Sequence, residues 1–463
     1  MLFPMMLHDD FANVMDAYPA SSLQKNLWTP HNEHAMPLGR LLTFVLAHIA
    51  GSASALPWVL TMLGPLVLLS TLGLIYLFVR REMDALSGLI AMAIYGLTSQ
   101  HHESVFWFAA VFFMIAFATA MLALLCAQWW IQKGSLLALP LCALFCAAAP
   151  AWNSVGLFAA PVCAVYLFLH PYALSTVGRV PDSSSLHSKP PLSSLAKRFL
   201  IAFVPILGVG LFLALNLTRN ADQIMHTGHY GDKTMLQSIK VIPGVIRTVA
   251  SLFDQLLIGT LGYLYALVFL EVPMWVSAVL GIPVVIALFL WFRRCERRDL
   301  FLVGLTFILA NNLLIHSARV DWSYERMRDW GRYNVFPHFG LALILLSGLG
   351  PWLRRWKANP RVPTWSLVVL GLVLVPHAIS CSMLWYDKEQ SEQLARIDRM
   401  DRLLRERQIS RELAIEVLPE LKMIANEGGR NGWELLRGSD NPKPISKAEA
   451  KRILLPFSRD RSD

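Results

Sequence analysis

Residues 56–79 read LPWVLTMLGPLVLLSTLGLIYLFV and are followed directly by Arg80-Arg81. A helix needs about 20 apolar residues to cross a hydrocarbon layer of ~30 Å, and this run meets that length without a charge. Similar runs recur along the chain. The sequence therefore predicts membrane helices near 56–79, 104–130, 198–218, 275–292, 299–316, 335–350 and 365–386, with shorter ones near 85–99, 135–150 and 154–169.

The composition agrees with this interpretation. Of the 463 residues, 55% are hydrophobic and 16% are charged, whereas soluble domains carry about 25% charged residues. We predict an all-α fold, a polytopic transmembrane bundle of about 10–12 membrane helices. The net charge of +9 comes largely from basic residues in short loops. This is the positive-inside pattern of membrane proteins and argues against a nucleic-acid partner.

Three regions are expected along the chain. Residues 1–35 form an acidic loop outside the cytoplasm, and residues 36–386 form the transmembrane domain. A Pro/Ser-rich cytoplasmic linker, 170–198, divides that domain. Residues 387–463 form a small, charged helical tail, which we expect to be extracytoplasmic. In the tail the first helix should end near Gln408, and the sequence Ser446 to Glu449 has the form of a capping box before a final helix.

The basic loops predict the topology. Arg80-Arg81, Lys133, the linker 170–198, the run 293–298 and the run 354–357 all fall on the cytoplasmic side if two doubtful segments do not cross completely. These segments, 36–52 and 246–270, contain polar residues and are expected to lie in the interface. The opposite, extracytoplasmic side then receives residues 1–35, 100–103, 219–245, 317–334 and the tail.

Asp9-Asp10 is the first candidate for chemistry on that side. Two neighbouring carboxylates in a partly desolvated site have raised pKa values and suit general-base catalysis. A base of this kind would activate an acceptor hydroxyl as a nucleophile. The alternative is that the pair caps a helix beginning near Phe11.

Two further polar clusters are expected to share that face. His31-Asn32-Glu33-His34 offers nitrogen and oxygen ligands at close spacing. The second cluster, Gln100 to Glu103, includes His102 and Glu103. The alternatives are polar capping before the helix that starts at Pro37 and an ordinary polar loop.

The loop 317–334 is rich in arginine although it is predicted to lie outside. Arg319, Arg326, Arg328 and Arg332 alternate there with acidic residues. Guanidinium groups bind phosphate bidentately, so the loop either clamps a lipid-linked phosphate or forms internal salt bridges. The cysteines show no ligand spacing with histidine. Cys142 and Cys146 lie one helical turn apart, and we expect them to be small packing residues.

The residues on the outer side resemble a known class. Asp9-Asp10-Phe11, followed by the stretch from Pro30 to Leu42, resembles the first outer loop of bacterial GT-C glycosyltransferases, the class of protein O-mannosyltransferases and aminoarabinose transferases of lipid A. Arg332-Tyr333 resembles the Arg-Tyr element that opens a late helix in that class. The resemblance covers roughly residues 8–386.

The resemblance implies an inverting transferase that moves a sugar from a polyprenyl-phosphate donor to a hydroxyl of a lipid, glycan or protein acceptor. It implies Asp9 as base, with Asp10 beside it as a partner or, together with Glu33 and His34, as a ligand of a divalent metal ion. The donor phosphate would meet Arg332, Tyr333, Arg328 and Arg40, and His31, Asn32, Glu33, His34, His102 and Glu103 would support the acceptor side. No Gly-rich nucleotide loop is present, so no nucleotide cofactor is expected.

The resemblance also implies a location in a bacterial inner membrane with the active site facing outward. Members of the class carry a membrane helix before the acidic pair, and we therefore expect either a translation start further upstream or an inactive, truncated product. The rival interpretations are a transporter or flippase of a lipid-linked substrate, and a lipid-linked glycan ligase or polymerase. Transporters place charges near the bilayer midplane and show internal repeats, neither of which the sequence suggests.

Overall fold

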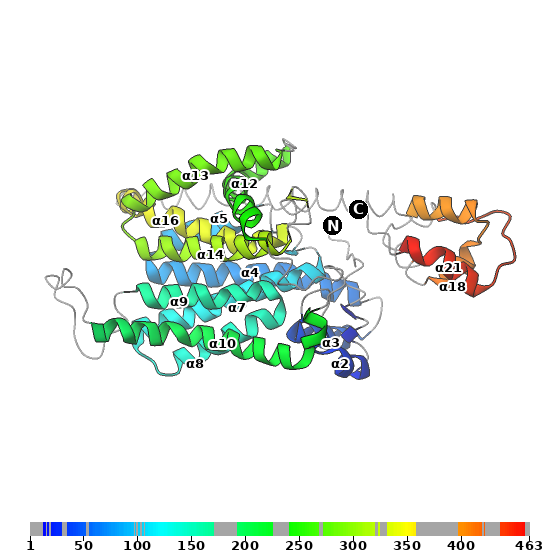
Figure 1. Ribbon diagram of the computed structural model, residues 1–463, viewed down its shortest axis with the longest axis horizontal. Coiled ribbons are helices and arrows are strands. Elements are labelled where there is room, and N and C mark those ends of the chain that lie inside the picture. The colour runs from blue at the N-terminus through cyan, green and yellow to red at the C-terminus, as the bar shows by residue number, and fades with distance from the viewer. Residues whose placement is uncertain are drawn as a thin grey trace. The chain divides into compact units, whose positions relative to one another are not determined.

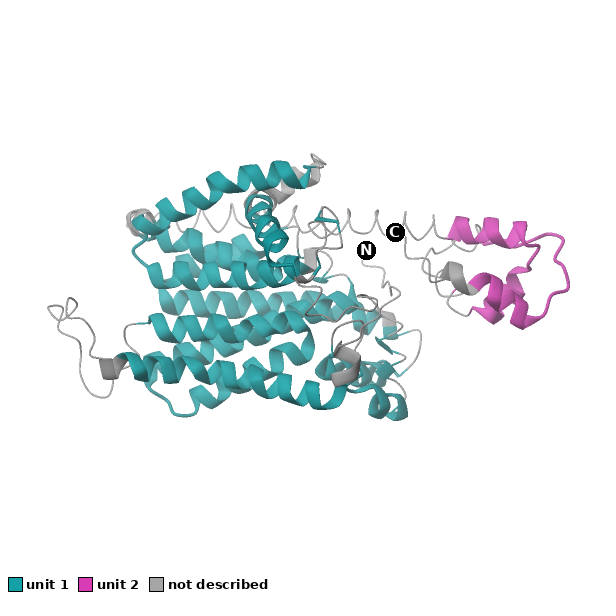
Figure 2. Cartoon of the chain, in the orientation of Figure 1, with its two compact units in different colours: residues 1–378 teal, residues 379–463 magenta. Residues whose placement is uncertain are grey.

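The computed structural model describes the backbone of residues 13–14, 16–17, 20–29, 35–51, 55–96, 98, 101, 104–105, 107–170, 192–225, 240–267, 272–319, 323–324, 331–357, 397–418, 421 and 436–458. The chain divides into two compact units, residues 1–378 and 379–463 (Figure 2). The sequence suggested a boundary at 386/387, and both positions lie outside the described residues. The fold class is confirmed, because the described residues are helical and contain no strand.

Five helices of the first unit are long and apolar enough to cross a membrane, within the part of the chain that is described. Each coincides with a predicted span, which makes the chain a membrane protein by helix length and composition. The predicted span 365–386 lies outside the described residues. The five are α4 (Leu56–Glu82), α7 (Phe108–Lys133), α10 (Leu192–Met225), α13 (Met274–Arg294) and α14 (Arg298–Ala318).

Shorter helices complete the bundle (Figure 1). The predicted segments 85–99, 135–150 and 154–169 are all found, and the span predicted at 335–350 continues to Lys357. These helices are α5 (Ala85–Gly96), α8 (Ala138–Trp152), the 3-10 turn η2 (Ser154–Phe158) with α9 (Ala159–Leu169), and α16 (Val335–Lys357).

The surface of the bundle suits a hydrocarbon solvent. α13 exposes Trp275 and Phe289, and α10 exposes Phe199, Leu200 and Leu211. In water such continuous apolar surface is rare on a monomer. α7 differs, since most of its apolar span is buried. It is therefore an interior helix, and α4, α8, α9 and α16 pack against it.

One end of the bundle collects the basic residues. α4, α7 and α13 finish there, and α10 and α14 begin there, at the left of Figure 1. Arg297 beside α14 is bonded to Glu82 at the end of α4, at 2.7 Å, which joins these termini directly. We call this end of the bundle the basic end. Its described cations include Arg80, Arg81, Lys133, Lys197, Arg198, Arg293, Arg294, Arg297 and Arg298.

The other end, which we call the distal end, holds the end of α5, the starts of α7 and α16, and the end of α14. Two helices there do not cross the bundle lengthwise. α3 (Pro37–Ala50) has 14 residues, about 21 Å at 1.5 Å per residue, and is too short to span. α12 (Val241–Leu267) is seen nearly along its axis in Figure 1, where α4, α7, α10 and α14 run across the picture. α3 and α12 correspond to the segments 36–52 and 246–270, which the positive-inside pattern required not to cross the membrane completely.

Aromatic rings fill the centre of the bundle. Phe117 of α7 lies 5.1 Å from Phe336 and 5.7 Å from Phe339 of α16, between ring centroids. Gly304 of α14 and Gly340 of α16 face each other so closely that a Cβ on Gly304 would lie 2.5 Å from the Gly340 carbonyl oxygen. Small residues at such crossings let membrane helices approach closely.

The second unit has its own small core, which includes Leu404, Ile409 and Leu454. Its first helix is described over 397–406, which agrees with the predicted end near Gln408. Gln408 lies in the turn that follows, with a φ of 56°. α21 (Lys447–Ser458) begins after Ser446, whose hydroxyl accepts the Glu449 N–H at 3.2 Å. A capping box has two reciprocal hydrogen bonds, and the structure confirms the one that the Ser446 hydroxyl accepts. The remaining named helix of this unit is α18 (Arg411–Val417).

Candidate functional site

Most residues that the sequence proposed for chemistry lie outside the described part of the chain. Arg40 and Tyr333 are described with their side chains, and Arg332 is described as a backbone position in the 3-10 turn η4 (Gly331–Asn334). The predicted roles of the others stay predictions. These are Asp9, Asp10, His31, Asn32, Glu33, His34, His102, Glu103 and Arg328.

Arg40 is fully buried near the start of α3. Its Nη2 donates to the Asp16 carboxylate at 2.9 Å, and its Nη1 donates to the carbonyl oxygens of Asn26 and Thr29. Burial lowers the pKa of the guanidinium, while the charge of Asp16 opposes that shift. Arg40 therefore fastens residues 16–29 onto α3, next to the predicted catalytic loop. Its guanidinium is engaged within the chain, so binding a phosphate would require it to give up these contacts.

Tyr333 is buried in η4, directly after Arg332. Its ring lies edge-on to Phe113 of α7, with centroids 5.7 Å apart, and the Arg319 guanidinium lies over the same ring at 5.5 Å. The Tyr333 carbonyl oxygen accepts a hydrogen bond from Asn311 of α14 at 2.9 Å. These contacts fix the Arg332-Tyr333 backbone at the distal end.

A buried amide network lies beside this turn, and the sequence reasoning noted only part of it. Gln255 of α12 donates to Asn334 at 2.9 Å and to Asn312 at 3.3 Å, and Asn312 donates to Ser251 at 2.9 Å. The signal in the sequence was the paired amides Asn311-Asn312 within an apolar helix, because polar side chains in such helices face a partner or a cavity. The network holds α12 across the ends of α14 and α16.

Asp254, the neighbour of Gln255, is also buried, and both of its carboxylate oxygens accept hydrogen bonds. The Tyr324 hydroxyl donates at 2.6 Å and the Ser277 hydroxyl at 2.8 Å. A carboxylate with donors on both oxygens is suited to holding structure together. Asp254 therefore connects α12 to α13 and to the described part of the arginine-rich loop.

His101 brings a third predicted loop to the distal end. Its buried ring lies 4.2 Å from the Tyr95 ring and 5.9 Å from the His338 ring, between centroids. Tyr95 in turn stacks on Phe117 of α7 at 5.2 Å. His101 directly precedes His102 and Glu103 in the sequence, and these two residues lie outside the described part of the chain.

The first half of α7 connects all three loops. Phe108 and Phe112 pack against Met36 just before α3, Phe113 contacts Tyr333, and Phe117 stacks on the Tyr95 ring that contacts His101. Segments far apart in the sequence thus contact the same helix, α7, at the distal end. The flanks of the acidic loop, of the loop 100–103 and of the Arg332-Tyr333 turn are therefore brought together.

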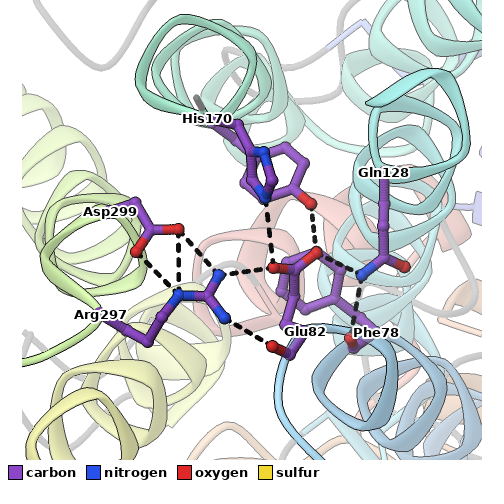
Figure 3. Close-up of polar contacts among 7 residues, drawn as sticks. Phe78, Glu82, Gln128, His170, Arg297 and Asp299 are labelled. Carbon is purple, nitrogen blue, oxygen red and sulfur yellow. Dashed lines mark hydrogen bonds and ion pairs between the residues drawn. The ribbon is translucent and has the colours of Figure 1, made fainter. Parts of the chain in front are cut away.

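A second polar cluster lies at the basic end, around the buried side chain of Glu82 (Figure 3). The carboxylate accepts hydrogen bonds from Tyr166 at 2.5 Å, Gln128 at 2.6 Å and Arg297 at 2.7 Å. His170 lies 3.7 Å from the same carboxylate. The sequence reasoning missed this cluster, because its members come from α4, α7, the ends of α9 and the start of α14.

Glu82, His170 and Asp299 have ligand atoms close enough to hold a metal ion. Arg297, however, bridges both carboxylates, at 2.7 Å from Glu82 and 2.8 Å from Asp299. Burial alone lowers the pKa of Arg297, but hydrogen bonds and charge from Asp299 and Glu82 outweigh burial and raise it. The guanidinium supplies the positive charge that a metal would supply, so the cluster is a buried ion pair joining α4 to α14.

Comparison of the chain with models of protein families, with curated proteins and with solved structures finds no match in any of the three.

Proposed function

We propose that the chain is a GT-C-like membrane glycosyltransferase whose active site lies at the distal end. It takes a sugar from a polyprenyl-phosphate donor and transfers it, with inversion, to a hydroxyl of a lipid, glycan or protein acceptor. The observation that carries the proposal is the convergence on α7. Met36, His101 and Tyr333, which flank the three loops bearing the proposed site residues, all connect to the segment Phe108–Phe117.

The proposed reaction is a direct displacement at the anomeric carbon of the donor sugar. Asp9 takes the proton of the acceptor hydroxyl, and the oxygen attacks the anomeric carbon of the donor. The bond from that carbon to the phosphate oxygen breaks, and polyprenyl phosphate leaves with the electron pair. Asp10 is the carboxylate next to Asp9 in the sequence, and neighbouring carboxylates suit general-base catalysis. No general acid is needed, because phosphate is a stable leaving group.

The leaving phosphate needs positive charge. Arg332 with Arg328 supplies it in our proposal, since guanidinium groups match phosphate oxygens bidentately. Tyr333 and its contact with Phe113 support this by anchoring the Arg332 backbone. Arg40 has a positioning role, because its guanidinium already engages Asp16 and two carbonyl oxygens. The acceptor is oriented by the remaining polar residues of the two loops, which are His31, Asn32, Glu33, His34, His102 and Glu103.

A divalent ion at Asp10, Glu33 and His34 belongs to the same proposal. Oxygen and imidazole ligands suit hard or borderline divalent ions, and such an ion would add charge stabilisation at the leaving phosphate. These three residues lie outside the described part of the chain, and no step above depends on the ion.

The location follows the charge pattern. The basic end would face the cytoplasm of a bacterial cell and the distal end the opposite side of the inner membrane. A mostly membrane-embedded enzyme fits a donor with a long hydrocarbon tail. The transporter alternative is less well supported, because the buried ion pair of Glu82 and Arg297 lies at the basic end of the bundle and not halfway along it.

The test is the release of polyprenyl phosphate from labelled polyprenyl-phosphate sugars by membranes that contain the full chain. Wild type and the variant Asp440→Asn, a matched change at an exposed site of the second unit, should release it equally. Asp9→Asn should abolish release, and Arg332→Lys should reduce it. Absence of release from correctly inserted wild-type protein, with and without added divalent ion, would overturn the transferase proposal and favour transport.

A further inference from the structure

Three cysteines meet inside the bundle at a place unrelated to either polar cluster. Cys142 and Cys146 lie on successive turns of α8, and Cys163 lies on the neighbouring helix α9. All three side chains are fully buried. Their sulfur atoms all lie within 4.8 Å of one another. The sequence suggested packing roles for Cys142 and Cys146; the fold adds the third sulfur.

The geometry is that of a soft ligand set. Two thiols one helical turn apart point to the same side of α8, and the third comes from the helix that follows after η2. Their neighbours in the core are apolar, including Ala149, Val162 and Leu167. Within the described residues, the cluster of possible metal ligands here contains sulfur alone, with no carboxylate or imidazole. Thiolate ligands select Cu(I), zinc and other soft ions over hard ones.

The number of ligands decides between these ions. Zn²⁺ is held in closed tetrahedral sites with four protein ligands, and three sulfurs do not complete that set. Cu⁺ accepts low coordination numbers and carries one charge. One thiolate and two neutral thiols around Cu⁺ make a neutral unit in the apolar interior. An uncompensated charge there is expensive.

We propose that Cys142, Cys146 and Cys163 form a binding site for monovalent copper. Cys126 of α7 is partly buried and lies outside this group of three sulfurs. The bound ion would fasten α8 to α9 across the turn η2. The site is independent of the proposed transferase, since it lies in the interior and uses none of the residues assigned to that reaction.

The test is an anaerobic titration of the full chain, purified in detergent, with Cu(I) in competition with a chromophoric Cu(I) chelator. Wild type should take up one tightly held Cu(I) per chain and show the ultraviolet charge-transfer absorption of copper bound to thiolate sulfur. Cys146→Ala and Cys163→Ala should lose this uptake. Cys295→Ala is the matched control, because Cys295 is also buried but its sulfur contacts the Ser347 hydroxyl at 3.2 Å, and it should keep the site.

Several outcomes would overturn the proposal. One is the absence of stoichiometric uptake by reduced wild type, and another is equal uptake by a variant with Cys142, Cys146 and Cys163 all replaced by alanine. A third is a thiol titration of the unfolded wild type that finds fewer free thiols than cysteines, since the missing thiols would indicate a disulfide between the helices. If an alanine variant does not fold, the wild-type absorption and the X-ray absorption count of sulfur ligands still decide the matter.

Discussion

Glu82 illustrates how a single buried residue joins four helices. Its carboxylate receives hydrogen bonds from Tyr166, Gln128 and Arg297, and Arg297 also donates to the Glu82 backbone carbonyl oxygen. Charges buried in a protein are tolerated where they are paired and hydrogen-bonded. The sequence indicated that Arg297 lies in a basic loop, but not which acidic residue it meets, because the pairing depends on how the helix ends converge.

Replacing Glu82 with alanine should strongly destabilise the first unit. It removes the partner of Arg297 and leaves the Tyr166 and Gln128 donors unsatisfied. Breaking a buried pair costs about 3–5 kcal/mol, and we expect the lower end because Arg297 keeps Asp299 and is partly exposed. Thermal unfolding in detergent measures the effect. Glu296→Ala, at an exposed neighbouring position, should change the midpoint little; equal loss in both variants would contradict the assignment.

Arg40 gives a second prediction for a single residue. Lysine cannot satisfy the Asp16 carboxylate and two carbonyl oxygens at once, because it lacks the planar fork of arginine. Arg40→Lys should therefore loosen residues 16–29 without unfolding the bundle. Hydrogen exchange over Ala20–Thr29 should accelerate, and the proposed transferase activity should fall. Lys25→Ala, an exposed change on α2 (Ala20–Asn26), is the control. Unchanged exchange in Arg40→Lys would show that the tether is not needed.

At the scale of helices, the sequence predicted much of what the structure shows. Apolar runs placed α4, α7, α13 and α14 within a few residues, since the cost of exposing backbone polar groups in lipid forces such runs into helices. The orientation of α12 and the neighbours of α7 were beyond sequence reasoning. They depend on contacts between distant segments, such as Gln255 with Asn334 and Phe113 with Tyr333.

The crossing of α14 and α16 gives a prediction for elements. Gly304→Ala should be destabilising, because the added Cβ would meet the Gly340 carbonyl oxygen at 2.5 Å and the backbones would have to separate. Overpacking of this kind costs about 1–3 kcal/mol. Gly210→Ala on α10 makes the same chemical change with no atom within 4 Å of the new Cβ, and should be neutral or slightly stabilising. Unfolding midpoints that do not separate the two variants would contradict this packing.

At the scale of the whole molecule, the two ends have different character. The basic end gathers the cations and the Glu82 cluster, and the distal end gathers the buried amides, the tyrosines and the flanks of three predicted site loops. The candidate site itself was only partly predictable. Composition and spacing suggested Asp9, Asp10 and Arg332, whereas the connection of Met36, His101 and Tyr333 to α7 depends on long-range packing.

The topology predicts which loops are accessible from outside a cell. A cysteine introduced as Thr227→Cys, in the loop 219–245, should react with a membrane-impermeant maleimide on intact cells. Ser184→Cys, in the linker 170–198, should react only after the cells are opened, because the basic loops stay in the cytoplasm. The reverse pattern would place the distal end inside and contradict the proposed orientation.

The most direct test of the central claim is the sidedness of donor cleavage in sealed vesicles. A water-soluble, short-chain polyprenyl-phosphate sugar is added outside right-side-out vesicles and, separately, outside inside-out vesicles containing equal amounts of the protein. The account predicts release of the lipid phosphate in right-side-out vesicles alone, and loss of this release in Asp9→Asn. Release in inside-out vesicles alone, or release that persists in Asp9→Asn, would contradict an Asp9-dependent transferase site at an outward-facing distal end.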